Sequence, residues 1–136
     1  MRQLLVISLL AVAAGAGCSR PRDDGAARAV TVPTVSVDEL DHLLASGASQ
    51  AVDANGSLTR QKMGVIPGAV LLRDYASTEG LPSDKSRGLV FYCANPACSA
   101  SHEAARKAIA AGYRDVKVMP DGIAGWVKAG KKTQAL

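Results

Sequence analysis

Four consecutive apolar residues, LVFY at 89–92, constrain the fold more than any other part of this sequence. A short run without a polar position is typical of a central strand in a parallel sheet, which is covered on both faces. Residues 99–111 follow with alanines along one side and Glu103 on the other, a pattern that predicts an amphipathic helix. A buried strand followed directly by a helix indicates an α/β domain.

Strands and helices alternate along the rest of the chain. The predicted strands cover 30–36, 51–53, 69–72 and 115–119, and the other predicted helices cover 36–47 and 121–128. Pro33 places the first strand at a sheet edge, because proline cannot donate a backbone hydrogen bond. Ser36 with Glu39 predicts a capping box, and Asp121 predicts an N-cap. We expect a mostly parallel sheet of four or five strands flanked by helices.

Cys93 directly follows the strand at 89–92 and comes just before the predicted helix. Ligands of such sheets bind at the carboxyl ends of the strands. Backbone N–H groups of the loop and of the first helical turn favour an anion there, so we expect a reactive thiolate rather than a structural bridge.

Several motifs occur in a fixed order around this cysteine. They are Val52-Asp53, Gly64-Val-Ile-Pro-Gly-Ala69, Phe91-Tyr-Cys93 with the loop to Cys98, Gly112-Tyr-Arg-Asp-Val116, Gly122 and Gly125-Trp126. Over residues 30–130 this order resembles the rhodanese-like domain, the sulfurtransferase module that carries a persulfide on a loop cysteine.

The resemblance implies a role for each part of this loop. Cys93 would accept sulfane sulfur from thiosulfate or a persulfide and pass it to a thiol acceptor. The substrate-binding loop would comprise Ala94, Asn95, Pro96, Ala97, Cys98 and Ser99. Its N–H groups would surround the sulfur, except at Pro96, which has none. Asp53 would tie loops together as structural support, and the fold implies no cofactor.

The sequence also departs from the family pattern. Val65 stands where the family has histidine, and Asn55 stands where it has an arginine two residues after the strand aspartate. The loop contains no Arg or Lys to meet an anionic donor, so a persulfide donor is as plausible as thiosulfate. Arg73 and Arg87 lie outside the loop as possible substitutes.

Cysteine phosphatases and arsenate reductases are excluded by the same lack of a loop arginine. These enzymes need Cys, five residues and then Arg to grip the oxyanion with two hydrogen bonds. The sixth residue after Cys93 is Ser99.

Three interpretations of Cys98 stay open. It can fill the loop, form a disulfide with Cys93, or act as a resolving thiol that releases the sulfur carried by Cys93. Two alternative functions follow: a thiol–disulfide redox protein that uses both cysteines, and a binding module that has kept the fold and lost turnover. Together with His102 the cysteines match no zinc spacing, so we expect no metal site.

The N-terminal region has the pattern of an export signal. Residues 1–17 combine Arg2 with an uncharged apolar run, and Cys18 after small residues predicts lipidation. Cleavage after Ala16, giving a protein without the anchor, is the alternative. Polar residues 18–29 are a predicted flexible tether to a domain at 30–136. We therefore expect a periplasmic or cell-envelope protein, anchored to a membrane through Cys18.

The charge pattern bears on possible partners. The formal net charge is +4, and the chain has one Phe and one Trp. This combination predicts no basic and aromatic surface for nucleic acid. We expect a monomer whose partners are a small sulfur donor and a thiol acceptor.

Overall fold

The computed structural model describes residues 29–136. The predicted signal peptide, Cys18 and all of the predicted tether but its last residue lie outside the described residues. The strands are β1 Ser49–Asp53, β2 Val70–Leu71, β3 Gly88–Tyr92 and β4 Val116–Val118. The helices are α1 Val37–Ala45, α2 Ser57–Met63, α3 Ala100–Ala110 and α4 Gly122–Lys128. No helix within residues 29–136 has the length and apolar character to cross a membrane.

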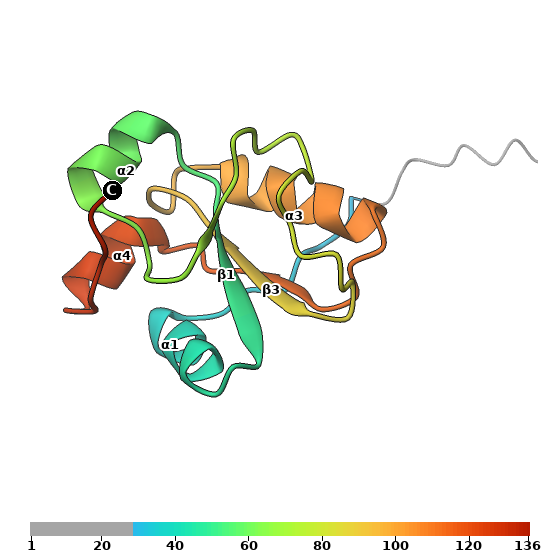
Figure 1. Ribbon diagram of the computed structural model, residues 1–136, viewed down its shortest axis with the longest axis horizontal. Coiled ribbons are helices and arrows are strands. Elements are labelled where there is room, and N and C mark those ends of the chain that lie inside the picture. Colours follow the sequence, from blue (N-terminus) through green and yellow to red (C-terminus); the bar gives the residue numbers. More distant parts are fainter. Residues whose placement is uncertain (1–28) are drawn as a thin grey trace, which may run out of the picture.

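The four strands form one parallel sheet in the order β2-β1-β3-β4, as predicted for an α/β domain. Every residue of β3 is buried, because helices cover both faces of the sheet. Alanines of α3 pack on one face, and apolar residues of α1 and α4 pack on the other. Figure 1 shows α3 and α1 on opposite sides of β1 and β3.

Two expectations about the helix and strand ends need correction. The predicted strand at 30–36 is reduced to a single bridge between Thr34 and Val118, since the chain enters α1 only three residues later. Asp121 makes no capping hydrogen bond, because its backbone is already helical rather than extended. The predicted capping box of Ser36 and Glu39 is confirmed.

Helix α2 was not predicted from the sequence. None of its residues is buried, so it has no apolar face to produce a helical period. It begins after Gly56, which makes no side-chain cap. The helix nevertheless matters for the site, because it carries Arg60.

The C-terminal tail, residues 131–136, is fixed to the rest of the domain at three places. Val65 and Gln134 exchange two backbone hydrogen bonds of 2.9 and 2.8 Å. The indole of Trp126 donates to the carbonyl of Lys132 at 2.8 Å. The ammonium group of Lys131 lies 2.7 Å from the carboxylate of Asp41. The tail therefore connects α1, α4 and the segment between α2 and β2.

Candidate functional site

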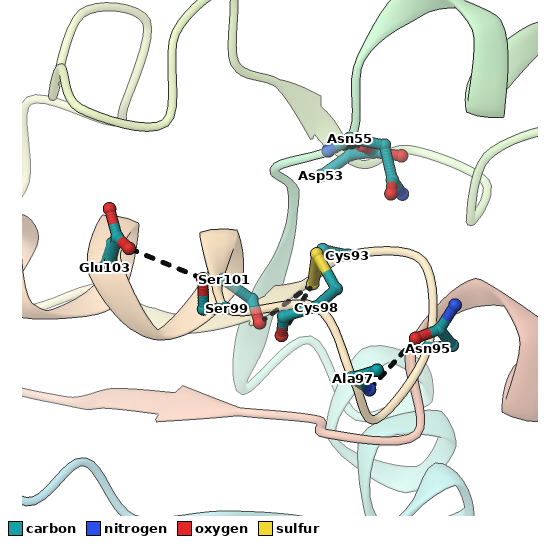
Figure 2. Close-up of a disulfide and its surroundings, with 9 residues drawn as sticks. All are labelled: Asp53, Asn55, Cys93, Asn95, Ala97, Cys98, Ser99, Ser101 and Glu103. Atoms are coloured by element: carbon teal, nitrogen blue, oxygen red, sulfur yellow. Dashed lines mark hydrogen bonds between the residues drawn. A yellow bond between two sulfur atoms is a disulfide. The ribbon is translucent and has the colours of Figure 1, made fainter.

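Cys93 follows β3 at the carboxyl end of the sheet, and the residue is 2% exposed. It forms a disulfide with Cys98, as Figure 2 shows. The free thiolate that we expected is therefore oxidised, and Cys98 does more than fill the loop. The two Cα atoms lie 6.3 Å apart, within the range that disulfides require.

Asn95 shapes the loop between the two cysteines. Its side-chain oxygen accepts from the N–H of Ala97 at 2.9 Å. Its backbone carbonyl accepts from the N–H of Cys98 at 3.0 Å. This turn brings Cys98 back toward Cys93. In the disulfide form, the N–H groups of Ala97 and Cys98, which we expected around the sulfur, are thus hydrogen-bonded to Asn95 instead.

The first half of the loop is fixed by the start of α4. The N–H groups of Ile123 and Ala124 donate to the carbonyls of Cys93 and Ala94, at 2.8 and 3.0 Å. Gly122 makes this approach possible. A Cβ at this position would lie 2.6 Å from the carbonyl carbon of Ala94, and its φ of 65° is one that side chains rarely adopt.

Ser101 contacts the sulfur of Cys93. Its hydroxyl is buried on α3 and lies 3.3 Å from Sγ, close enough to donate a hydrogen bond to it. We did not select this serine from the sequence. Its helical spacing in the sequence could have identified it, because Ser101 shares the buried side of α3 with Ala104, Ala105 and Ala108. A hydroxyl on an otherwise apolar helix face needs a partner.

We expect the Ser101→Ala substitution to slow alkylation of Cys93 in the reduced protein by about fivefold to tenfold at neutral pH, because a hydrogen bond to a thiolate favours that form. The profile of iodoacetamide reaction rate against pH should move to higher pH. Ser99→Ala is the matched control, since the Ser99 hydroxyl contacts Glu103 rather than sulfur. Equal rates in wild type and Ser101→Ala would contradict this role.

Asp53 is fully buried at the carboxyl end of β1. Its carboxylate accepts from the N–H of Asn55 at 2.7 Å, the guanidinium of Arg60 at 3.1 Å and the hydroxyl of Tyr92 at 2.7 Å. The Tyr92 hydroxyl in turn accepts from the N–H of Ile66. These contacts join β1, α2 and β3 through one buried carboxylate.

Arg60 reaches this network from α2. It also donates to the carbonyl oxygens of Asp53 and Leu72. Arg60, five residues after Asn55, therefore supplies a guanidinium to the Asp53 carboxylate. Burial, and then the charge of Asp53, raises the pKa of Tyr92 above its ordinary value, so the hydroxyl stays protonated and donates to the carboxylate.

The side-chain amide of Asn55, drawn beside Asp53 in Figure 2, is a further buried polar group. The residue is 7% exposed, and its Nδ2 has no hydrogen-bond partner among the described residues. A buried amide donor of this kind is costly unless something pairs with it. The Asn55 amide is therefore a buried donor without a partner among residues 29–136.

Arg73 and Arg87, the two arginines considered as substitutes for a loop cation, lie at opposite ends of the sheet. Arg87 directly precedes β3, so it lies at the amino end and away from Cys93. Arg73 comes two residues after β2, at the carboxyl end that also holds Cys93. His102 is half-buried on α3. Residues 29–136 contain no cluster of three or more His, Cys, Asp or Glu that would suit a metal ion.

Comparison with known proteins gives one family. The family model described as Rhodanese-like domain matches residues 36–129. No curated protein matches the chain.

Solved structures share the fold. The chain is similar to the rhodanese-like domain of the Alr3790 protein from Anabaena sp., with 24% identity, a TM-score of 0.64, and coverage of 78% of this chain and 81% of that one. It is also similar to a human single domain sulfurtransferase, TSTD1 (24% identity, TM-score 0.57, 72% and 97% covered). A third relative is a thiosulfate sulfurtransferase from Pseudomonas aeruginosa (21% identity, TM-score 0.63, 76% and 20% covered).

Proposed function

This chain belongs to the family of rhodanese-like domains, and on that premise we propose that its reduced form carries sulfane sulfur as a persulfide on Cys93. The observation that carries the proposal is the position of the Cys93 sulfur. It lies at the carboxyl end of β3, against the hydroxyl of Ser101. The sulfurtransferases among the solved relatives support the same reaction class.

The reaction starts once a dithiol reductant has opened the disulfide. The Cys93 thiolate attacks the outer sulfur of a donor R–S–SH, the S–S bond of the donor breaks, and R–S⁻ leaves. The product is Cys93–S–SH. An acceptor thiolate then attacks the outer sulfur, takes it as its own persulfide and regenerates the Cys93 thiolate.

The disulfide favours a second candidate function, in which the same pair reduces a persulfide. The Cys98 thiolate attacks the inner sulfur of Cys93–S–SH, forms the Cys93–Cys98 disulfide and releases HS⁻. The structure contains the disulfide that this step would produce. A disulfide also suits an oxidising compartment, in line with the export signal expected from the sequence.

Intact-mass spectrometry tests both functions. The reduced protein is incubated with thiosulfate or a low-molecular-weight persulfide, and sulfide release is measured in parallel. We expect wild type to gain one sulfur atom, or to form the disulfide and release one sulfide for each sulfur accepted. Cys98→Ala should keep the extra sulfur, which would identify Cys98 as the resolving thiol.

Cys93→Ala is the decisive variant, because it leaves Cys98 as a thiol in the same loop. It should gain no sulfur and release no sulfide. A gain of sulfur by Cys93→Ala, or no reaction of wild type with either donor, would overturn both enzymatic functions and favour the binding-module alternative.

A further inference from the structure

The two cysteines of the disulfide differ in their access to solvent. Cys93 belongs to a buried core cluster, and the residue is 2% exposed. Cys98 is half-buried and packs against that cluster. Its two neighbours in the chain, Ala97 and Ser99, are exposed. A molecule that approaches from solvent therefore reaches Cys98 more readily than Cys93.

The direction of attack increases this difference. A thiolate that opens a disulfide approaches one sulfur from the side opposite the sulfur that leaves. An attack on Cys93 would need room on its side away from Cys98. Cys93 is buried there together with Ser101, which is 1% exposed and has its hydroxyl 3.3 Å from the Cys93 sulfur (Figure 2). An attack on Cys98 needs room only at the half-buried end of the disulfide.

The two sulfur atoms also differ as leaving groups. The Ser101 hydroxyl can donate a hydrogen bond to the Cys93 sulfur once that sulfur becomes a thiolate. Within residues 29–136 no side chain donates a hydrogen bond to the Cys98 sulfur. A better stabilised thiolate leaves faster in thiol–disulfide exchange. Access and leaving group therefore both favour attack on Cys98.

We propose that a dithiol reductant opens this protein through the sulfur of Cys98. The first thiolate of the reductant attacks the Cys98 sulfur, the bond between the two cysteines breaks, and Cys93 leaves as a thiolate. The second thiol of the reductant, after losing its proton, attacks the reductant's own sulfur in the mixed disulfide. Cys98 then leaves as a thiolate and takes up a proton. Two electrons pass from the reductant, which becomes a disulfide, to the protein.

This order of events assigns different roles to the two cysteines. Cys98 receives the electrons, and Cys93 is released as the thiolate that attacks a sulfur donor. The proposal rests on the sulfur transfer proposed above, because the opening step is what prepares Cys93 for that reaction. The opening itself needs no sulfur donor, so it can be measured separately.

Trapping the mixed disulfide tests the assignment. Oxidised wild-type protein is treated briefly with glutathione, which lacks the second thiol that completes the reduction, and N-ethylmaleimide then caps the freed thiol. Both cysteines lie in one tryptic peptide, residues 88–106, so fragment ions must separate the two positions. We expect glutathione on Cys98 and maleimide on Cys93, in about tenfold excess over the reverse arrangement at early times.

The rate of opening tests the leaving group. Ser101→Ala should slow reduction by dithiothreitol about threefold to tenfold, because the departing Cys93 thiolate loses a hydrogen bond. Intact-mass spectrometry of acid-quenched and alkylated samples gives the rate. Ser86→Ala is the matched control, since this exposed hydroxyl before β3 bonds to Asp84, and its rate should equal that of wild type.

The outcomes separate this proposal from the sulfur transfer. Glutathione found mainly on Cys93, or a Ser101→Ala rate equal to that of wild type, would overturn the role of Cys98, even in a protein that carries sulfur on Cys93. Glutathione on Cys98 together with slower reduction of Ser101→Ala, in a protein that accepts no sulfur from any donor, would support the order of opening and refute the sulfur transfer.

Discussion

Replacing Gly122 with alanine is expected to lower the free energy of unfolding by about 2–5 kcal/mol, and to disturb the cysteine loop with it. The new Cβ would lie 2.6 Å from the carbonyl carbon of Ala94 and 2.7 Å from the carbonyl oxygen of Cys93. Backbone atoms cannot rotate away as a side chain can. To relieve the contact, α4 must withdraw from the loop and lose the two hydrogen bonds that Ile123 and Ala124 donate.

Gly130→Ala is the control for this substitution. Gly130 has a φ of 74°, close to the 65° of Gly122, but a Cβ there would meet no atom within 4 Å. It should therefore show only the conformational cost of a positive φ, about 1–2 kcal/mol. Urea unfolding measures both variants, and the rate of sulfur loading reports on the loop. Equal losses of stability in the two variants would mean that the close approach to Cys93 and Ala94 has no energetic importance.

Asp53→Ala should lower the free energy of unfolding by about 3–5 kcal/mol, because it removes one partner of a buried ion pair. The Arg60 side chain is only 12% exposed in this pair, and its charge would lose its counterion. The hydroxyl of Tyr92 would lose its acceptor as well. Thermal or urea unfolding measures the loss.

The double variant with Arg60→Ala tests the reason for this loss. If Asp53→Ala is costly because it leaves a buried cation, then removing Arg60 as well should cost less than the sum of the two single substitutions. Additive losses would show that Asp53 and Arg60 stabilise the protein independently. Asp53→Asn should be milder than Asp53→Ala, since its amide oxygen can still accept a hydrogen bond.

The parts of this fold that the sequence could predict are those with a strong local pattern. The apolar run at β3 and the alanine face of α3 both produce a clear period, so the position of Cys93 between them followed directly. Helix α2 buries no residue and gave no such signal. Because α2 was missed, the contact between Arg60 and Asp53 was missed too, and Asn55 was interpreted as the loss of an arginine.

The state of the two cysteines could not be predicted for a different reason. Whether Cys93 and Cys98 pair depends on how the loop turns at Asn95, and several loop conformations are compatible with the same six residues. The contact between Ser101 and the sulfur depends on the same geometry, although its place on the buried helix face could be found from the spacing.

The C-terminal tail shows that the end of the family match and the end of the packed chain are at different residues. The family match ends at residue 129, whereas the contacts of the tail run from Lys131 to Gln134. The tail provides hydrogen-bond partners for the indole N–H of Trp126 and the backbone of Val65. It also packs closely against Gly64, where a Cβ would lie 2.9 Å from the carbonyl oxygen of Gln134. The packed part of the chain therefore extends beyond the residues that the family model matches. A chain that stopped at residue 129 would keep every residue of the cysteine loop and lose the tail contacts to α1, to α4 and to Val65 in the segment between α2 and β2.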